Sequence, residues 1–370
     1  SIHVKAASLA NFKFKKAKDM KVKDTADKEL FVGIDIHKRS WKIHTSTDLF
    51  NGTSLTMPVD PIKLKNWVDK LYPGHKVSCA YEAGCCGYSA HRMFRAFGWR
   101  SIVFNPADLS RTGKAQYQKT DKIDAQLICR ELKDGRLHGI TVPDPEREQL
   151  RSLFRARNNL VKDLRRTKSR IKSQLLFMGI KVPQEFDNPN WSKAFLEWIS
   201  SQEFAYNTAK ESLQSLLRQY QFVDEQLRDA SNRLRAWCRK HQKRDYNLLR
   251  SIPGIGGITA CGILSELGNL RRFGNFRQLS AYVGLIPGVS ESGEKQATSR
   301  MNPRGNRIMR SYFVEAAWQA LRFDPVMQQY YRSHAGKDSK AIIVKVANKL
   351  LRRTLAVIKT GIPYQPGVVQ

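Results

Sequence analysis

Hydrophobic and polar positions follow two different periods in the first third of the chain. Spacing of about 3.6 residues predicts helices at 62–71, at 88–97 and from about 121 to 133. Short apolar or alternating runs predict β-strands at residues 30–36, 41–46, 49–57, 76–82 and 100–105. Strands that alternate with helices after an opening meander predict an α/β domain over residues 30–140.

The middle of the chain, residues 141–245, has helical periodicity. One helix is predicted from Glu146 to about Met178, and a second helical segment follows a break at 183–192 and runs to about Arg239. Spacing of three and four residues in the second segment predicts a coiled coil. Its apolar positions are Leu213, Leu216, Tyr220, Val223, Leu227, Ala230, Leu234 and Trp237. The pattern leaves open whether the two helices pair within one chain or between protomers.

Residues 246–370 predict a compact, mostly helical domain, with helices at 276–282, 306–321 and 339–359. Within it, Pro253-Gly-Ile-Gly256 joins two helical segments. A tight glycine hairpin can expose backbone amides to a phosphate, so Gly254 and Gly256 are candidate nucleic-acid contacts. A simple turn between helices is an equally good interpretation of this sequence.

Charge narrows the class of partner. The 370 residues contain 64 Lys and Arg against 33 Asp and Glu, which gives a net charge of +31. So basic a chain is typical of proteins that bind a polyanion. No apolar run has the length of a membrane span, and no signal-peptide core follows the first residues. We therefore expect a nucleic-acid partner, no membrane and a cytoplasmic location. Residues 1–29 read as a basic N-terminal arm.

Other residues refine this picture. The six cysteines form no pair at zinc-binding spacing, so we expect reduced thiols that mostly pack. Arg165 and Arg166, on the basic helix of the middle segment, and Arg300 and Arg304, near the C-terminal loop, are candidate nucleic-acid contacts.

Four acidic residues are the first candidates for chemistry. Asp35 and Glu82 end predicted strands, and Asp121 and Asp124 open a predicted helix three residues apart, on one face. Carboxylate oxygens suit Mg²⁺, which can offset the negative charge of a phosphodiester. Each acid alone has a simpler interpretation as a turn former or a helix cap. No role is assigned to His37, His44 and His75, which lie near the acids in the sequence.

A loop rich in small residues is the second candidate. It contains Ser290 and Ser292, and Ser299 follows, with several arginines within reach. A serine that attacks a phosphate needs nearby cations to bind the phosphoryl oxygens. The residues alone do not choose among the three serines, and a surface turn is the simpler interpretation.

Taken together and in order, these motifs resemble the DEDD transposases of insertion sequences. The N-terminal motifs are Gly33-Ile-Asp35, Tyr81-Glu82-Ala-Gly84, Asn105-Pro106 and Lys119-Thr-Asp121-Lys-Ile-Asp124-Ala125. The C-terminal motifs are Ile252-Pro-Gly-Ile-Gly256, Ala281-Tyr-Val-Gly-Leu-Ile-Pro-Gly288, Glu291-Ser-Gly293 and Ser299-Arg300-Met301. The resemblance covers about residues 30–140 and 246–362.

The resemblance implies a RuvC-like, RNase H-type fold for residues 30–140 and a C-terminal transposase domain for 246–370. It matches Asp35, Glu82, Asp121 and Asp124 to the family's Mg²⁺-binding acids, and Ser292 to its nucleophile. It also implies a recombinase guided by a structured RNA, called a bridge RNA, that pairs with donor and target DNA. The implied assembly is a tetramer, a dimer of dimers joined by the coiled coil.

Two other functions stay open on the sequence. One is a metal-dependent endonuclease of the Holliday-junction type, without a covalent intermediate. The other is a non-catalytic nucleic-acid-binding protein, which would leave the four ordered acids unexplained.

Overall fold

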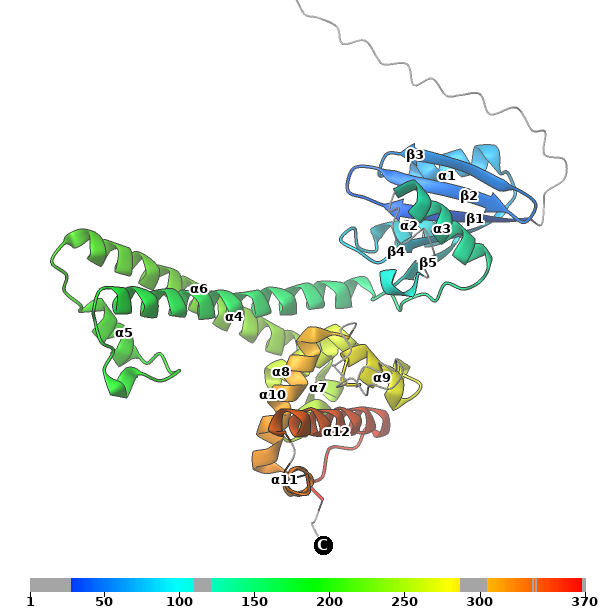
Figure 1. Cartoon of the computed structure of the whole chain (residues 1–370). Coiled ribbons are helices and arrows are strands. Elements are labelled where there is room, and N and C mark those ends of the chain that lie inside the picture. Colours follow the sequence, from blue (N-terminus) through cyan, green and yellow to red (C-terminus); the bar gives the residue numbers. More distant parts are fainter. Residues whose placement is uncertain (1–27, 110–120, 287–304, 335, 337, 368–370) are drawn as a thin grey trace, which may run out of the picture. The chain divides into compact units, whose positions relative to one another are not determined.

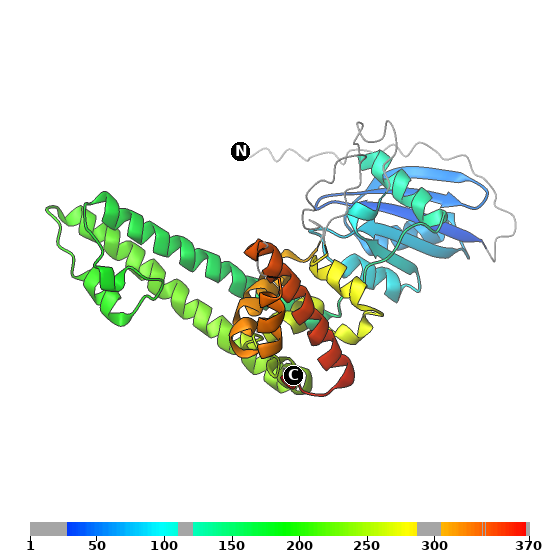
Figure 2. The ribbon, with the colours of Figure 1, turned by 60° about the horizontal axis from the view of Figure 1, so that its bottom comes forward.

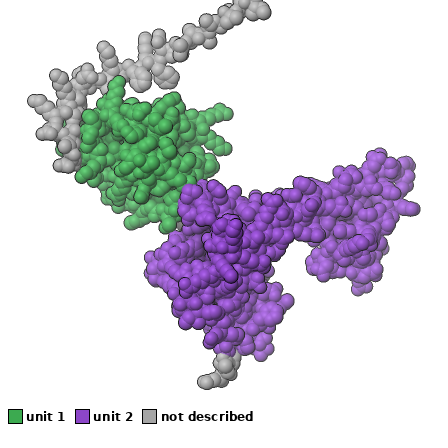
Figure 3. Space-filling view, turned by 180° about the vertical axis from the view of Figure 1, so that it is seen from behind, with its two compact units in different colours: residues 1–142 green, residues 143–370 purple. Residues whose placement is uncertain are grey.

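The computed structural model of the chain describes residues 28–109, 121–286, 305–334, 336 and 338–367. The N-terminal arm up to residue 27 lies outside these residues. The chain divides into two compact units, Ser1–Val142 and Pro143–Gln370 (Figure 3). The expected mixed α/β sheet lies in the first unit, and the described part of the second unit is helical.

The first unit is built on a five-stranded mixed sheet. Its spatial order is β3-β2-β1-β4-β5. β1 pairs antiparallel with β2 and parallel with β4. β3 and β5 complete the edges, antiparallel to β2 and parallel to β4, respectively. The strands are β1 (Glu29–Ile36), β2 (Trp41–Thr47), β3 (Asn51–Met57), β4 (Lys76–Glu82) and β5 (Arg100–Phe104).

Helices cover both faces of this sheet (Figure 1). α1 (Pro61–Leu71) and α2 (Ser89–Ala96) pack on one face, where Trp41 and Phe94 meet edge to face. α3 (Asp121–Lys133) packs on the other face, and its Ile128 shares a core with Phe31 and Ala80. The alternation along β1 explains this division, because successive strand side chains point to opposite faces.

The second unit begins with a long helical hairpin. α4 (Pro145–Phe177) and α6 (Asn207–His241) lie side by side in the same chain, as both ribbon views show (Figures 1 and 2). α5 (Lys193–Ser200) packs at the far end of the hairpin, where Phe195 joins its core. The structure thus describes the pairing within one chain that the sequence left open.

The second unit continues with short helices before two longer ones. They are α7 (Lys243–Arg250), α8 (Gly257–Gly262), a π-helix η4 (Ile263–Leu267), a 3₁₀ turn η5 (Leu270–Arg272), α9 (Phe276–Val283), α10 (Arg307–Phe323), α11 (Pro325–Arg332) and α12 (Ser339–Thr360). Leu150 and Phe154 of α4 share one core with these C-terminal helices. Leu234 and Cys238 of α6 lie in the same core. The base of the hairpin is therefore part of the same hydrophobic core as the C-terminal helices.

Candidate active site

Asp35 and Glu82 lie at the same end of two neighbouring parallel strands. β1 and β4 are in register up to the pair Ile34 and Tyr81, and the two acids come next in each strand. Phe31 and Ala80, which lie an even number of residues earlier, belong to the core beneath α3. Because strand side chains repeat every second residue, both carboxylates lie on the face that α3 covers.

Asp124 reaches this end of the sheet because α3 runs antiparallel to β1. The Cys129 thiol donates to the carbonyl oxygen of Phe31 at 3.3 Å. One turn later, the Lys133 ammonium donates to the carbonyl oxygen of Thr47, which pairs with Leu30 at the start of β1. The start of α3, with Asp124, therefore lies toward the end of β1 that carries Asp35. Asp121 is the first residue of α3; its side chain lies outside the described residues.

Gly33 permits this close approach of helix and sheet. A Cβ atom at Gly33 would lie 2.3 Å from the carbonyl oxygen of Ala125 and 2.5 Å from the amide nitrogen of Cys129. Both obstacles are backbone atoms of α3, so a side chain at position 33 could enter only if the helix moved. The glycine thus fixes the distance between the two acids on the strands and the acid on the helix.

We expect Gly33→Ala to push α3 away from the sheet and to destabilise the first unit by about 1–3 kcal/mol, a typical cost of overpacking. Hydrogen exchange of the full-length protein should accelerate in peptides that cover β1 and α3. Gly84→Ala is the matched control, because the nearest atom to its added Cβ is 4.0 Å away. Unchanged protection in Gly33→Ala would show that the helix does not depend on this contact.

His37 contacts one of the candidate acids, an interaction that the sequence did not predict. Its Nε2 lies 3.0 Å from Oδ2 of Asp35, and the His37 side chain is half exposed. His37 directly follows the end of β1, two residues after Asp35, and its ring turns back to the Asp35 carboxylate. This spacing was the available signal, and it points to a side chain that can orient the Asp35 carboxylate.

The acid group suits Mg²⁺ chemically but is incomplete among the described residues. No three His, Cys, Asp or Glu side chains of the described part of the chain are close enough to share a metal ion. Mg²⁺ is commonly held by one or two carboxylates together with substrate phosphates and water. Asp35 and Glu82 are the candidates for such a pair. Asp124 lies on the adjacent helix, and the Asp121 side chain lies outside the described residues.

The loop with the candidate serines, including Ser292, lies outside the described residues, as do Arg300 and Arg304. The structure does describe where this loop leaves and rejoins the fold. A Cβ atom at Gly305 would lie 2.3 Å from Cα of Gly284, so the two glycines touch through their backbones. The Asn306 amide donates to the carbonyl oxygen of Tyr282 at 2.8 Å. The loop therefore starts and ends at one point of the second unit.

A buried carboxylate holds this point of the fold together. Glu266 is fully buried in the π-helix η4 and pairs with two arginines of α4: Arg155 Nε lies 2.7 Å and Arg151 Nε 3.1 Å from its carboxylate oxygens. The Asn306 side-chain amide donates to the same carboxylate at 2.9 Å. Glu266 thus joins the hairpin to the end of the serine loop. A π-helix often marks a functional position.

Burial alone would raise the pKa of Glu266, but the hydrogen bond from Arg155 and the charge of Arg151 outweigh it and hold the pKa below the ordinary value of 4.5. A carboxylate with a depressed pKa contributes stability above its unfolded-state pKa, and this contribution is lost as pH falls through the folded-state pKa. The Glu266 contribution should therefore be complete near neutral pH and be lost as the pH falls through the lowered pKa of folded Glu266.

We expect Glu266→Gln to lower the free energy of unfolding of the second unit by about 3 kcal/mol at pH 7, because it removes the buried counter-charge that Arg151 and Arg155 contact. Urea unfolding at several pH values measures this, and the difference from wild type should shrink as the pH falls through the lowered pKa of Glu266. Glu225→Gln, on the exposed side of α6, should have little effect. A pH-independent difference would rule out the charge as the cause.

The other predicted nucleic-acid contacts lie in different parts of the second unit. Gly254 adopts a φ of +88°, and an added Cβ would lie 2.2 Å from the carbonyl oxygen of Ala316, so this glycine packs on α10. Gly256 is exposed, with no atom within 4 Å of its Cβ direction. Arg165 and Arg166 are exposed on α4, and Arg166 pairs with Asp163 at 3.2 Å.

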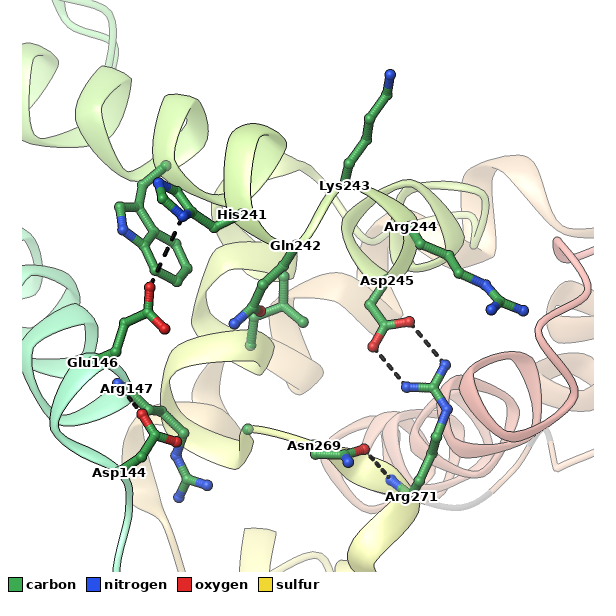
Figure 4. Close-up of a pocket in the computed structure, with 13 residues that line it drawn as sticks. Asp144, Glu146, Arg147, His241, Gln242, Lys243, Arg244, Asp245, Asn269 and Arg271 are labelled. Carbon is green, nitrogen blue, oxygen red and sulfur yellow. Dashed lines mark hydrogen bonds and ion pairs between the residues drawn. The ribbon is translucent and has the colours of Figure 1, made fainter.

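A pocket of about 490 Å³ opens between the bases of α4 and α6 and the segment after η4 (Figure 4). Its charged side chains largely pair with one another. Arg271 binds both carboxylate oxygens of Asp245, at 2.7 and 2.8 Å, and His241 lies 3.9 Å from Glu146. Three acidic residues and four Lys or Arg residues line the pocket, so its charge is slightly positive.

Comparison with known proteins now defines the class. Residues 32–180 match the DEDD transposase model of IS110 elements, and residues 246–332 match the transposase model of the IS116/IS110/IS902 family. The first match contains the four candidate acids, and the second contains the candidate serines.

Curated relatives agree with this class. The transposase for insertion sequence element IS1328 of Yersinia enterocolitica is 25% identical over 347 residues, which cover 89% of this chain and 97% of the relative. The transposase for IS1111A of Coxiella burnetii is 26% identical and covers 67% of each chain. A pilin gene-inverting protein of Moraxella bovis is 30% identical over 34% of this chain and 41% of its own length.

The chain belongs to the DEDD-type transposases of insertion sequences. It is thus a member of a family of DNA-recombining enzymes, and DNA is its substrate class. Of the helices that the structure describes, none combines the length and the apolar character that a membrane crossing requires.

Proposed function

We propose that this transposase exchanges DNA strands through a covalent phosphoserine intermediate at Ser292, with Mg²⁺ bound by Asp35, Glu82, Asp121 and Asp124. The observation that carries the proposal is the convergence of strand-end and helix-start acids at one edge of the sheet. The family matches support it, because they span both the acids and the segment around the serine loop.

The same observations support assigning the first unit to the RuvC-like, RNase H-type fold. Its central strand β1 pairs with an antiparallel strand on one side and a parallel strand on the other, and the acids follow the parallel pair. In this proposal residues 30–140 form the acid-bearing domain, 141–245 the helical connection and coiled coil, and 246–370 the serine-bearing domain.

The serine chemistry conserves the phosphodiester energy. The Ser292 oxygen attacks the phosphorus, an Oγ–P bond forms, and the bond from phosphorus to the 3′ oxygen of the cut strand breaks. The 3′ hydroxyl of the partner strand then attacks the phosphoserine and releases the serine. Bound Mg²⁺ would offset the charge that develops on the phosphate. Asp35 and Glu82 would hold the ion at a fixed place, since both extend from paired strands.

We further propose that a structured bridge RNA selects the donor and target DNA, and that the protein works as a tetramer. The net charge of +31 supports several nucleic-acid partners, because their phosphates must be screened when they share one protein. The long basic helix α4 carries exposed arginines at Arg155, Arg165, Arg166 and Arg170. In this assembly the acid domain of one protomer would complete the site around the serine of another.

A covalent-adduct assay tests the proposed function. Full-length protein is incubated with donor DNA, target DNA, the RNA encoded beside its gene and Mg²⁺, and the products are denatured before electrophoresis. We expect DNA that migrates with the protein and is released by protease. Cleaved DNA free of protein at every time point would instead favour the hydrolytic endonuclease, and no cleavage with or without Mg²⁺ would favour a non-catalytic binding protein.

A further inference from the structure

Arg151 and Arg272 contact Tyr282, which lies two residues before Gly284 where the serine loop leaves the second unit. Arg147, Arg151 and Arg155 follow one another at one-turn intervals on α4, and Arg272 ends η5. Glu266 takes Arg151 and Arg155 as its partners. Arg147 and Arg272 therefore carry positive charge that this buried carboxylate does not neutralise.

Arg147 is held in place by the backbone of Gly268. Its side chain lies against the backbone of Gly268, where a Cβ atom would come within 2.3 Å of Arg147 Nη1. The buried Nε of Arg147 has no hydrogen-bond acceptor among the described residues. The Asp144 side chain, which lies nearby, accepts from the Arg147 backbone amide (Figure 4). A half-buried guanidinium in this state has unused donors for an anion.

Arg272 is oriented by aromatic rings. Its guanidinium carbon lies 4.1 Å from the ring centre of Phe273 and 5.2 Å from that of Tyr282. Its side chain also donates to the carbonyl oxygen of Leu267, at 3.4 Å. Stacking of this kind fixes the plane of a guanidinium and leaves its edge available.

Arg147 packs against Gly268, and Arg272 donates to the carbonyl oxygen of Leu267, so the two cations meet at neighbouring residues of one turn. Burial lowers the pKa of Arg147 below its ordinary value, and the charge of Arg272 lowers it further. An anion placed between the two guanidiniums would offset their repulsion. Binding of an anion is therefore favourable at this position. The ring of Tyr282 stacks on Arg272, and its hydroxyl accepts a 3.4 Å hydrogen bond from Arg151. Its backbone carbonyl accepts the Asn306 amide at the base of the serine loop.

We propose that Arg147 and Arg272 together bind one backbone phosphate of the DNA at the base of the serine loop. This inference rests on the proposed function, because it places a DNA strand beside the loop. The ligand class is a phosphodiester, since a guanidinium pair can give two-pronged hydrogen bonds to the phosphate oxygens without reading a base.

The test measures DNA affinity against salt, in EDTA and without RNA, so that it is independent of covalent chemistry. Fluorescence anisotropy of full-length protein with a short labelled duplex is followed between about 50 and 200 mM KCl. We expect Arg147→Gln and Arg272→Gln each to weaken binding about tenfold. Each should also flatten the slope of log affinity against log salt by about 0.9, the share of one phosphate.

The double variant tests the shared phosphate. If both arginines contact the same group, its slope should change no more than in either single variant. A loss of about 1.8, twice the share of one phosphate, would overturn the shared site. Arg228→Gln and Arg233→Gln are matched controls, because each arginine pairs with an aspartate one turn earlier on α6. Slopes of the Arg147 variant equal to these controls would also overturn the proposal.

Two further arms separate the remaining explanations. Arg147→Lys keeps the charge but not the planar fork, so it should keep the salt slope and still bind more weakly; wild-type affinity in this variant would contradict a two-pronged contact. A labelled single-stranded RNA in place of the duplex tests the source of the phosphate. A defect seen only with RNA would overturn the assignment to DNA. If the arginine variants show the expected loss of salt slope but the wild-type protein forms no adduct, the phosphate site stands and only the serine chemistry is refuted.

Discussion

Replacing Ser292 with alanine is expected to remove the covalent protein–DNA product and to reduce strand exchange by about three orders of magnitude or more, as loss of a nucleophile does in other covalent enzymes. A methyl group cannot form the bond to phosphorus, whereas the loop and its anchoring at Gly284 and Gly305 are unchanged. The measurement is the amount of protein-linked DNA after denaturation, with the same donor DNA, target DNA and RNA.

The two neighbouring serines provide the controls. Ser290→Ala and Ser299→Ala remove a hydroxyl of the same size from the same segment and should form adducts at close to the wild-type level. DNA affinity of Ser292→Ala should equal that of wild type, which separates chemistry from binding. Adduct formed by Ser292→Ala at the wild-type level would disprove the role of this serine, and loss of adduct in one control alone would move the role to that residue.

Replacing Asp35 with asparagine is expected to reduce Mg²⁺-dependent strand transfer at least about 100-fold, because a metal ion contributes several kcal/mol to a phosphoryl transition state. Asparagine keeps the size of the side chain, and an amide remains able to receive a hydrogen bond from His37. The first unit should therefore stay folded while its charge at the strand end is lost. Initial rates of adduct formation at several Mg²⁺ concentrations measure the effect.

Asp48→Asn is the control for Asp35→Asn, because Asp48 is an exposed residue between β2 and β3 and its replacement removes the same charge from the same unit. It should leave the rate unchanged. Equal rates in wild type and Asp35→Asn at limiting Mg²⁺ would contradict a metal-binding role for Asp35, whatever the behaviour of the other acids.

The first unit was largely predictable because its signals are local. Alternating apolar residues marked the strands, and the sequence placed Asp35 and Glu82 at strand ends, whereas the pairing of β1 with β4 came from the structure. The close packing of α3 on the sheet could not be predicted from the sequence, since it depends on Gly33 contacting backbone atoms of Ala125 and Cys129, about ninety residues later. Contact over such a separation leaves no periodic pattern in either segment.

The second unit was predicted less completely. The expected helix after residue 192 is two helices, α5 and α6, although residues 201–206 contain no Gly or Pro that would signal a break. In α6 the buried positions include Leu217 and Cys238, where the heptad pattern predicted Leu216 and Trp237. The helix packs against different partners at its two ends, and this rotates the buried face away from a strict seven-residue repeat.

Nothing in the sequence indicated that Glu266 is buried or that it pairs with two arginines. It lies in an apolar stretch, Ile263–Leu267, where a single acid reads as a solvent-facing residue. Its burial follows from Arg151 and Arg155, more than a hundred residues earlier in the chain, which supply the counter-charge that allows a carboxylate to be buried. Only the folded chain shows that this acid supports the base of the serine loop.

The central claim is that Asp35, Glu82 and the acids at the start of α3 hold one divalent metal ion for DNA strand transfer. Electron paramagnetic resonance of Mn²⁺, a spectroscopic substitute for Mg²⁺, measures binding to full-length protein with a bound DNA duplex. The account predicts a bound Mn²⁺ signal in wild type and in Asp48→Asn, and its loss in Asp35→Asn and in Glu82→Gln. Undiminished Mn²⁺ binding in both Asp35→Asn and Glu82→Gln would contradict it.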